Sequence, residues 1–252
     1  MHEFLLYSQI PVTRHEQVLH ILAGVCAAQP ISICEQHLIY QQLKVADAAG
    51  SKKGAPAKHQ SAQAQRPSYH KLVREVSTGD GEQGAWRFRA EDVPQPGMQA
   101  VISRPVEEKV LDQAELEKFR EGGSWYKYAL AISSETLRHT NIGRYINQFI
   151  APTQRFVHQN VIIRVSRILS VPEGTGALEP LDAPPLVIAD CRPVDPSGSY
   201  LFEALVRVED GTNSKLTEQA MSELMALKSE LEGAVDLRVP DRLSLDTRVK
   251  GV

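Results

Sequence analysis

Short segments in which apolar and polar residues alternate recur along most of this chain, and they constrain its fold more than any other feature. Apolar residues occupy every second position in two segments: Trp86, Phe88 and Ala90, and Tyr200, Phe202, Ala204, Val206 and Val208, which alternate with Leu201, Glu203, Leu205 and Arg207. A period of two places apolar groups on one face of a β-strand and polar groups on the other. We therefore expect a protein built mainly from strands.

The same alternation recurs elsewhere. It predicts further strands over 3–10, 31–45, 69–77, 126–132 and 161–169, with short strands near 98–102, 106–110 and 186–188. A hairpin through Pro196-Ser197-Gly198 is expected to join the strands 186–188 and 200–208. Because closure removes exposed edges, a set of about eight strands favours a barrel. The expected fold class is mainly β (α+β), a multi-stranded antiparallel β-barrel with a few flanking helices.

Three segments have the apolar spacing of helices. Thr13 and Glu16 have the spacing of a capping box and precede an apolar stripe, so a helix is expected to begin there. Asp112 and Glu115 predict a second, short helix by the same argument. A third helix is expected over 214–232. The first of these helices is expected to pack on the sheet.

One stretch departs from the alternating pattern. The segment 46–67 is rich in small and polar residues, and such a composition cannot bury enough surface to offset its ordering entropy. Strand patterns resume after it. We therefore expect a single β-barrel domain over 1–252, with a disordered surface insert over 46–67.

The net charge and the cysteine content limit the cellular compartments and the classes of partner that are expected. The net charge of −3 argues against a broadly cationic surface, so direct binding to nucleic acid is not expected. Cys26, Cys34 and Cys191 lack metal-ligand spacing and are expected to be free thiols in a reducing compartment. The start of the chain lacks a signal-peptide pattern, and no apolar run is long enough to cross a bilayer. A soluble intracellular protein with no membrane partner is expected.

The sequence lacks the common catalytic motifs. It has no G-x-S-x-G, P-loop or G-x-G-x-x-G. Its histidines have no ligand spacing and are expected to be solvated or singly hydrogen-bonded; they are His2, His15, His20, His37, His59, His70, His139 and His158. We therefore assign no catalytic, metal-binding or cofactor-binding residue, and no cofactor.

Hydrolysis of polyphosphates inside the tunnel of a closed β-barrel is the one catalytic alternative. A β-barrel that hydrolyses polyphosphates needs carboxylates on one strand face to hold a divalent metal. The first strand offers Glu3 alone, and the consecutive Glu107 and Glu108 point to opposite faces. Glu115 and Glu117 fall in a predicted helix, where they do not share a face. Active tunnel chemistry is therefore disfavoured.

Two sets of arginines are candidates for surface contacts. Arg155, Arg164 and Arg167 cluster in sequence and are expected on a solvated sheet, with Arg164 and Arg167 on opposite faces. Arg87 and Arg89 share a face and could form a pair that contacts a partner.

The order of elements resembles the Mediator subunit 18 family. The opening Glu3-Phe4-Leu5-Leu6-Tyr7-Ser8-Gln9-Ile10-Pro11, the helix through Ala28-Gln29-Pro30 and the strand after it resemble the start of that family. The segment 154–169 looks like its most recognisable strand pair, and the insert over 46–67 resembles the variable loop of fungal members. The resemblance spans nearly the whole chain.

The resemblance carries functional expectations. It implies a barrel of the triphosphate-tunnel type without metal-binding carboxylates, and a non-enzymatic scaffold subunit of the Mediator head module that supports RNA polymerase II transcription initiation in the nucleus. It also implies a heterodimer with Mediator subunit 20, docking of the C-terminal helix of Mediator subunit 8, contacts with other head-module subunits, and an indirect link to RNA polymerase II. Partner-binding residues are not assigned. The alternative is a tunnel-type polyphosphate or RNA triphosphate hydrolase.

Overall fold

The computed structural model describes residues 1–41, 68–76, 83–95, 100–120, 144–172, 181 and 188–247. The strands are β1 (His2–Ile10), β2 (Ile31–Gln41), β3 (Tyr69–Glu75), β4 (Arg87–Glu91), β5 (Ile102–Val110), β6 (Arg144–His158), β7 (Val161–Ser166), β8 (Leu169–Ser170), β9 (Arg192–Pro193) and β10 (Tyr200–Val208). The α-helices are α1 (His15–Cys26), α2 (Gln113–Arg120) and α4 (Ser214–Glu230), and the 3-10 helices are η1 (Val12–Arg14), η4 (Ile188–Asp190) and η5 (Arg242–Leu245).

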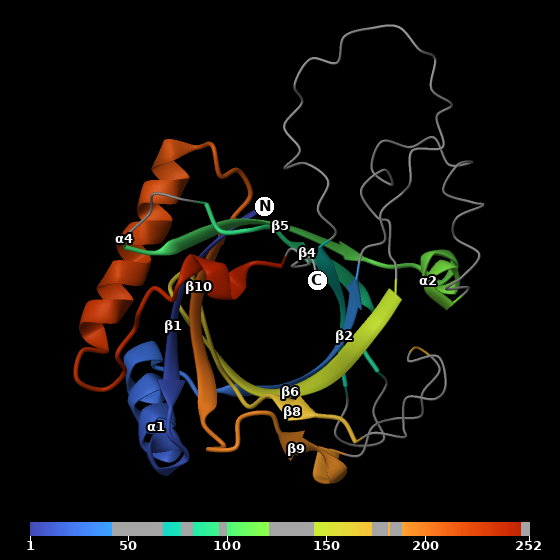
Figure 1. Cartoon of the computed structure of the whole chain (residues 1–252). Helices are drawn as coiled ribbons and strands as arrows, with labels where there is room; N and C mark the ends of the chain where they lie inside the picture. Colours follow the sequence, from blue (N-terminus) through green and yellow to red (C-terminus); the bar gives the residue numbers. More distant parts are fainter. Residues whose placement is uncertain are drawn as a thin grey trace, which may run out of the picture.

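Eight strands close into an antiparallel barrel. Their order is β2-β3-β4-β5-β1-β10-β7-β6, and β6 pairs back with β2 to complete the ring. Figure 1 shows this ring viewed into its opening. The short β8 and β9 extend from β6 outside the ring. The predicted antiparallel β-barrel is confirmed.

Two long-range pairings hold the ring closed. The first strand, β1, lies between β5 and β10, and it pairs with β10 along its whole length from His2↔Val208 to Ile10↔Tyr200. The β2–β6 pairing runs from Ile31↔Arg155 to Gln41↔Arg144. Both pairings join residues more than 100 positions apart, so the barrel depends on contacts between distant parts of the chain.

The main hydrophobic core lies between the outer wall of the barrel and two helices. Phe4 and Leu6 of β1 and Phe202 of β10 are buried there, on the opposite strand face from Glu3 and Leu5. Helices α1 and α4 cover this side of the ring in Figure 1. Apolar side chains from both helices, and Leu231 directly after α4, complete the core; those of the helices are Val18, Leu22, Ala220, Leu224 and Leu227.

A second outer core lies over β2, β3 and β4. Leu38, Leu72 and Phe88 pack there with Trp86, and Phe119 of α2 joins them. The capping box predicted for α2 is confirmed. The Asp112 side chain accepts from the Glu115 backbone N–H at 2.7 Å, and the Glu115 side chain accepts from the Asp112 N–H at 3.2 Å.

Three predictions of local structure are wrong. Thr13 does not cap α1, because η1 occupies that turn and α1 begins at His15 with no side-chain cap. The strand expected at 106–110 is not a separate short strand but part of the longer β5, and Ile102, expected to end another strand, begins β5. Residues 98 and 99 lie outside the described residues. The hairpin expected to pair 186–188 with 200–208 is not formed in the described residues, because Ile188 begins η4 and β10 pairs with β1 and β7 instead. Residues 186 and 187 lie outside the described residues.

Some predicted segments lie outside the described residues. These are the insert over 46–67 and the strand over 126–132. Within the described part of the chain, no helix has both the length and the apolar content to cross a membrane.

The segment after α4 returns to the barrel. Tyr7 and Arg238 exchange backbone hydrogen bonds at 3.0 and 2.8 Å. Farther on, the Tyr69 N–H donates to the Thr247 carbonyl at 2.8 Å. Pro240 and Leu245 from this segment line the interior cavity, and η5 lies beside the opening of the ring in Figure 1.

Candidate functional site

The interior of the barrel is a charged cavity of about 460 Å³. Alternation along each strand turns every second side chain inward, and many of these side chains are ionisable. Seven cationic side chains line the cavity: Lys71, Arg87, Arg89, Arg104, Arg155, Arg164 and Arg207. Four carboxylates line it with them: Glu35, Glu91, Glu108 and Glu203. We call this space the lumen.

A fifth carboxylate, Glu3, is completely buried in the lumen wall. Its oxygens accept hydrogen bonds from Arg89 at 2.7 Å, Arg104 at 3.2 Å and Arg207 at 3.0 Å. Burial alone would raise the pKa of Glu3, but the three guanidinium groups outweigh it and lower that pKa. Glu3 is therefore ionised and joins three strands of the ring.

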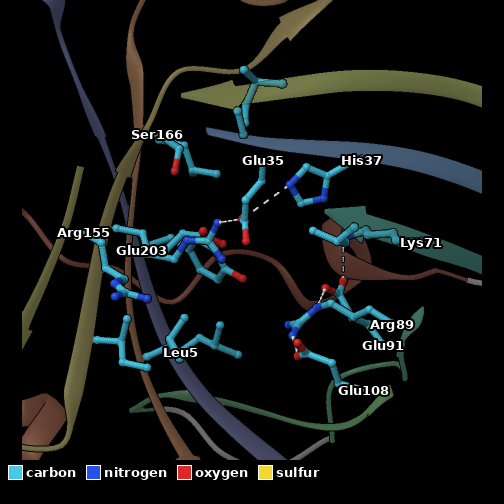
Figure 2. Close-up of a pocket in the computed structure, with 18 of the residues that line it drawn as sticks. Leu5, Glu35, His37, Lys71, Arg89, Glu91, Glu108, Arg155, Ser166 and Glu203 are labelled. Carbon is cyan, nitrogen blue, oxygen red and sulfur yellow. Dashed lines mark hydrogen bonds and ion pairs between the residues drawn. The ribbon is translucent and has the colours of Figure 1, made fainter. Parts of the chain in front are cut away.

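Glu91, a residue of β4, binds two of the arginines that bind Glu3. It accepts from Lys71 at 2.9 Å, from Arg89 at 2.7 Å and from Arg104 at 3.0 Å. Burial opposes ionisation, yet Lys71, Arg104 and Arg89 lower the pKa of Glu91 far below its ordinary value. Figure 2 shows Lys71, Arg89 and Glu91 meeting on one side of the lumen with Glu108 nearby.

Glu35 holds a second group of cations together. It accepts from Arg87 at 2.9 Å and also from Arg164, and the Nε2 atom of His37 lies 3.7 Å from it. Burial would raise the pKa of Glu35, but contacts with His37 and Arg164 lower it strongly. Because burial lowers the pKa of His37, this imidazole is neutral near pH 7, and the arginines balance the Glu35 charge.

Glu108 connects the two groups. It accepts from Arg87 at 3.1 Å and from Arg89 at 3.0 Å, and Arg207 lies 3.5 Å away. Four lumen carboxylates are thus engaged by guanidinium or ammonium groups. Among the described residues, no group of three or more His, Cys, Asp or Glu side chains is arranged to hold a metal ion.

Two charged residues of the lumen have no direct hydrogen-bond or ion-pair contact within the described part of the chain, namely Arg155 and Glu203. Glu203 still acts on Arg164 at longer range: burial would lower the pKa of Arg164, but the charges of Glu203 and Glu35 raise it. Figure 2 places Arg155 and Glu203 on the opposite side of the lumen from Lys71, Arg89 and Glu91. Their neighbour Arg164 lies between them in the sheet, opposite Arg155 on one side and Glu203 on the other.

The structure places the acidic candidates in different environments. Glu108 lines the lumen and Glu107 is exposed, so these consecutive carboxylates do point to opposite faces. Glu115 and Glu117 lie in α2, as predicted. Glu3 faces the lumen, where its partners are arginines.

The arginines differ from expectation. Arg87 and Arg89 share a face, as predicted, but this face lines the lumen and binds carboxylates. Arg155 and Arg164 also line the lumen and do not lie on a solvated outer sheet. Arg167 lies outside the lumen, with its guanidinium 5.8 Å from the ring centre of Tyr200.

Several lumen residues were not singled out from the sequence: Glu35, Lys71, Glu91, Arg104, Glu203 and Arg207. His37, expected to be solvated or singly hydrogen-bonded, also lines the lumen. A signal for them exists. In β4, Arg87, Arg89 and Glu91 alternate with the buried Phe88 and the half-buried Ala90. Charged residues at every second position of a strand whose other face is apolar fit an inward, ion-paired face as well as a solvated one.

Comparison with known proteins gives consistent matches. The family model described as Med18 protein matches residues 2–248. A Neosartorya fischeri protein named Mediator of RNA polymerase II transcription subunit 18 is 26% identical over 275 residues, covering 99% of this chain and 100% of that relative. An Aspergillus clavatus protein of the same name is 28% identical over 281 residues, with the same coverage.

A solved structure supports the fold. A chain in the structure of the Schizosaccharomyces pombe Mediator head module superposes with a TM-score of 0.64 and 16% sequence identity, covering 95% of this chain and 99% of that chain. At this identity, the likeness concerns the barrel architecture alone. The family match covers almost every residue from the first strand to the segment after η5. The chain therefore belongs to the Med18 protein family.

Proposed function

We propose that this protein is a non-enzymatic scaffold subunit of the Mediator head module, which acts in the nucleus and supports RNA polymerase II transcription initiation. The family match over residues 2–248 carries the proposal. The likeness to a chain of the Schizosaccharomyces pombe head module supports it, because that chain is matched over 99% of its length.

The partners proposed are Mediator subunit 20, as a heterodimer, and the C-terminal helix of Mediator subunit 8. Other head-module subunits are proposed as further contacts, with RNA polymerase II engaged indirectly. Exposed apolar side chains are compatible with docking, since stable interfaces need an apolar centre. They include Val12, Ile31, Val110, Val157 and Val194.

The state of the lumen carboxylates supports a scaffold over a hydrolase. Metal-assisted phosphoryl transfer needs carboxylate oxygens free to bind a divalent cation. Here Glu3, Glu35 and Glu91 accept hydrogen bonds from arginines or lysine. Replacing such partners with a metal would break several ion pairs at once.

Co-expression tests the proposal. The full chain is expressed with Mediator subunit 20 and the C-terminal segment of subunit 8, and the mixture is separated by size exclusion. We expect one complex that contains all three. A chain that elutes alone in the presence of both folded partners would contradict the proposal.

A parallel assay addresses the alternative. Phosphate release from triphosphorylated RNA is measured with magnesium or manganese, using wild type and Glu108→Gln. We expect no release above the protein-free blank. A release that disappears in Glu108→Gln would favour the hydrolase.

A further inference from the structure

Two arginines face each other across neighbouring strands inside the lumen. Arg155 of β6 is directly opposite Arg164 of β7 in the antiparallel register, and both line the cavity. Like charges in directly opposed positions destabilise a sheet. We propose that this arginine pair binds a small oxyanion of the phosphate type, which neutralises the repulsion.

The hydrogen bonding of the pair supports the proposal. Arg164 has a carboxylate partner in Glu35, whereas Arg155 has none among the described residues. The Nε atoms of both arginines are buried and lack an acceptor in the described structure. A buried donor without an acceptor costs free energy, so the site favours a ligand that supplies acceptor oxygens.

The lumen as a whole carries an excess of positive charge, as the arginine pair does. Seven cationic side chains line the cavity, against four carboxylates there and the buried Glu3. Within the described residues the cations are therefore in excess. Guanidinium groups bind phosphate oxygens through paired, charge-assisted hydrogen bonds, so no metal ion is needed.

The lumen offers room for such an ion. Its volume of about 460 Å³ is many times that of one water molecule, whose share of liquid volume is about 30 Å³. The side chains of Arg164 and Arg207 retain 20% and 32% of their exposure, so solvent reaches the cavity.

Glu203 limits the affinity. It lies directly opposite Arg164 on β10, where its charge attracts Arg164 without a direct ion-pair contact among the described residues. Its carboxylate would repel an oxyanion held between Arg164 and Arg155, across about one to two strand spacings of ~4.8 Å each. Removing this charge is therefore expected to strengthen binding, whereas removing the charge of Arg155 is expected to weaken it.

Isothermal titration calorimetry tests the proposal. It measures the binding of inorganic phosphate to the purified full chain at constant ionic strength in chloride. Pyrophosphate is titrated in a second arm to show whether one or two phosphoryl groups fit. The variants are Arg155→Gln, Arg155→Lys and Glu203→Gln. Arg192→Gln is the matched control, because Arg192 is an exposed arginine of β9 outside the lumen.

We expect saturable binding of phosphate or pyrophosphate to wild type and to Arg192→Gln. Loss of charge-assisted hydrogen bonds should raise the Kd about tenfold in Arg155→Gln, with a smaller rise in Arg155→Lys. Glu203→Gln should lower the Kd.

Three results would overturn the assignment. They are no saturable binding to wild type, equal Kd values for wild type and both Arg155 variants, or no gain in Glu203→Gln. If Arg155→Gln does not fold, as judged by circular dichroism, Arg155→Lys and Glu203→Gln still decide the outcome.

Discussion

The two faces of β1 and β10 differ in how they stabilise the barrel. On the outer face, Phe4, Leu6 and Phe202 pack against α1 and α4 in an apolar core. On the inner face of the same strands, Glu3 and Arg207 form an ion pair inside the lumen. The difference shows that one alternating strand can bury both of its faces when the inward charges neutralise each other.

The outer face is stabilised by close packing of large side chains. Removing one of them should lower the free energy of unfolding more than any other change. Phe202 is fully buried, so Phe202→Ala leaves a cavity that its neighbours fill only in part. We expect the free energy of unfolding in urea to fall by about 3–5 kcal/mol. Leu216→Ala on the exposed side of α4 is the control and should stay within about 0.5 kcal/mol of wild type. A smaller loss for Phe202→Ala than for a lumen charge would reverse the comparison.

The inner face depends on charge, and Glu3→Gln isolates that dependence. The substitution keeps the shape but leaves Arg89, Arg104 and Arg207 without their shared carboxylate. We expect a loss of about 3 kcal/mol near pH 7. Folding lowers the pKa of Glu3 below 4.5, so its stabilisation is present above pH 4.5 and is lost as the pH falls. The difference in the free energy of unfolding between wild type and Glu3→Gln should therefore become smaller in acid. The corresponding difference for Phe202→Ala should not.

The matched control for this charge is Glu107→Gln, because Glu107 is an exposed carboxylate of β5 outside the lumen. Its free energy of unfolding should match wild type closely at pH 7. A gap for Glu3→Gln that stays constant between pH 7 and pH 3 would show that packing, and not charge, gives Glu3 its role.

The smallest expected effect concerns the helix that covers the outer face. The Asn213 side chain accepts hydrogen bonds from the backbone N–H groups of Lys215 and Leu216 at 3.1 and 3.3 Å, which caps α4. Asn213→Ala should cost about 1 kcal/mol. Thr13→Ala is the control and should cost less, because Thr13 makes no capping bond in the structure. Equal losses for the two variants would mean that the cap does not anchor α4.

The sequence predicted the outer half of the structure better than the inner half. Alternation in β4 and β10 identified the strands, and the Asp112 and Glu115 pair identified the start of α2, because both signals are local. Closure between β2 and β6 depends on residues more than 100 positions apart, and no local pattern encodes that pairing.

The lumen was harder to predict for a physical reason. Arg87 and Arg89 alternate with apolar residues in the manner of a solvated strand face. Only the closed ring brings Arg89 of β4 to Glu3 of β1, which lie 86 positions apart in sequence. The capping box at Thr13 failed for a different, local reason: a 3-10 turn follows Pro11 and shifts the helix start to His15.

The place of β1 between β5 and β10 has a consequence for synthesis of the protein. A ribosome makes β1 first, yet the strand that pairs with its whole length ends at Val208. Until that residue emerges, one edge of β1 has no strand partner, and Glu3 lacks Arg207. The ring can therefore close only after β10 has been made, and such late, long-range pairing is slow and leaves sheet edges open to aggregation in the meantime.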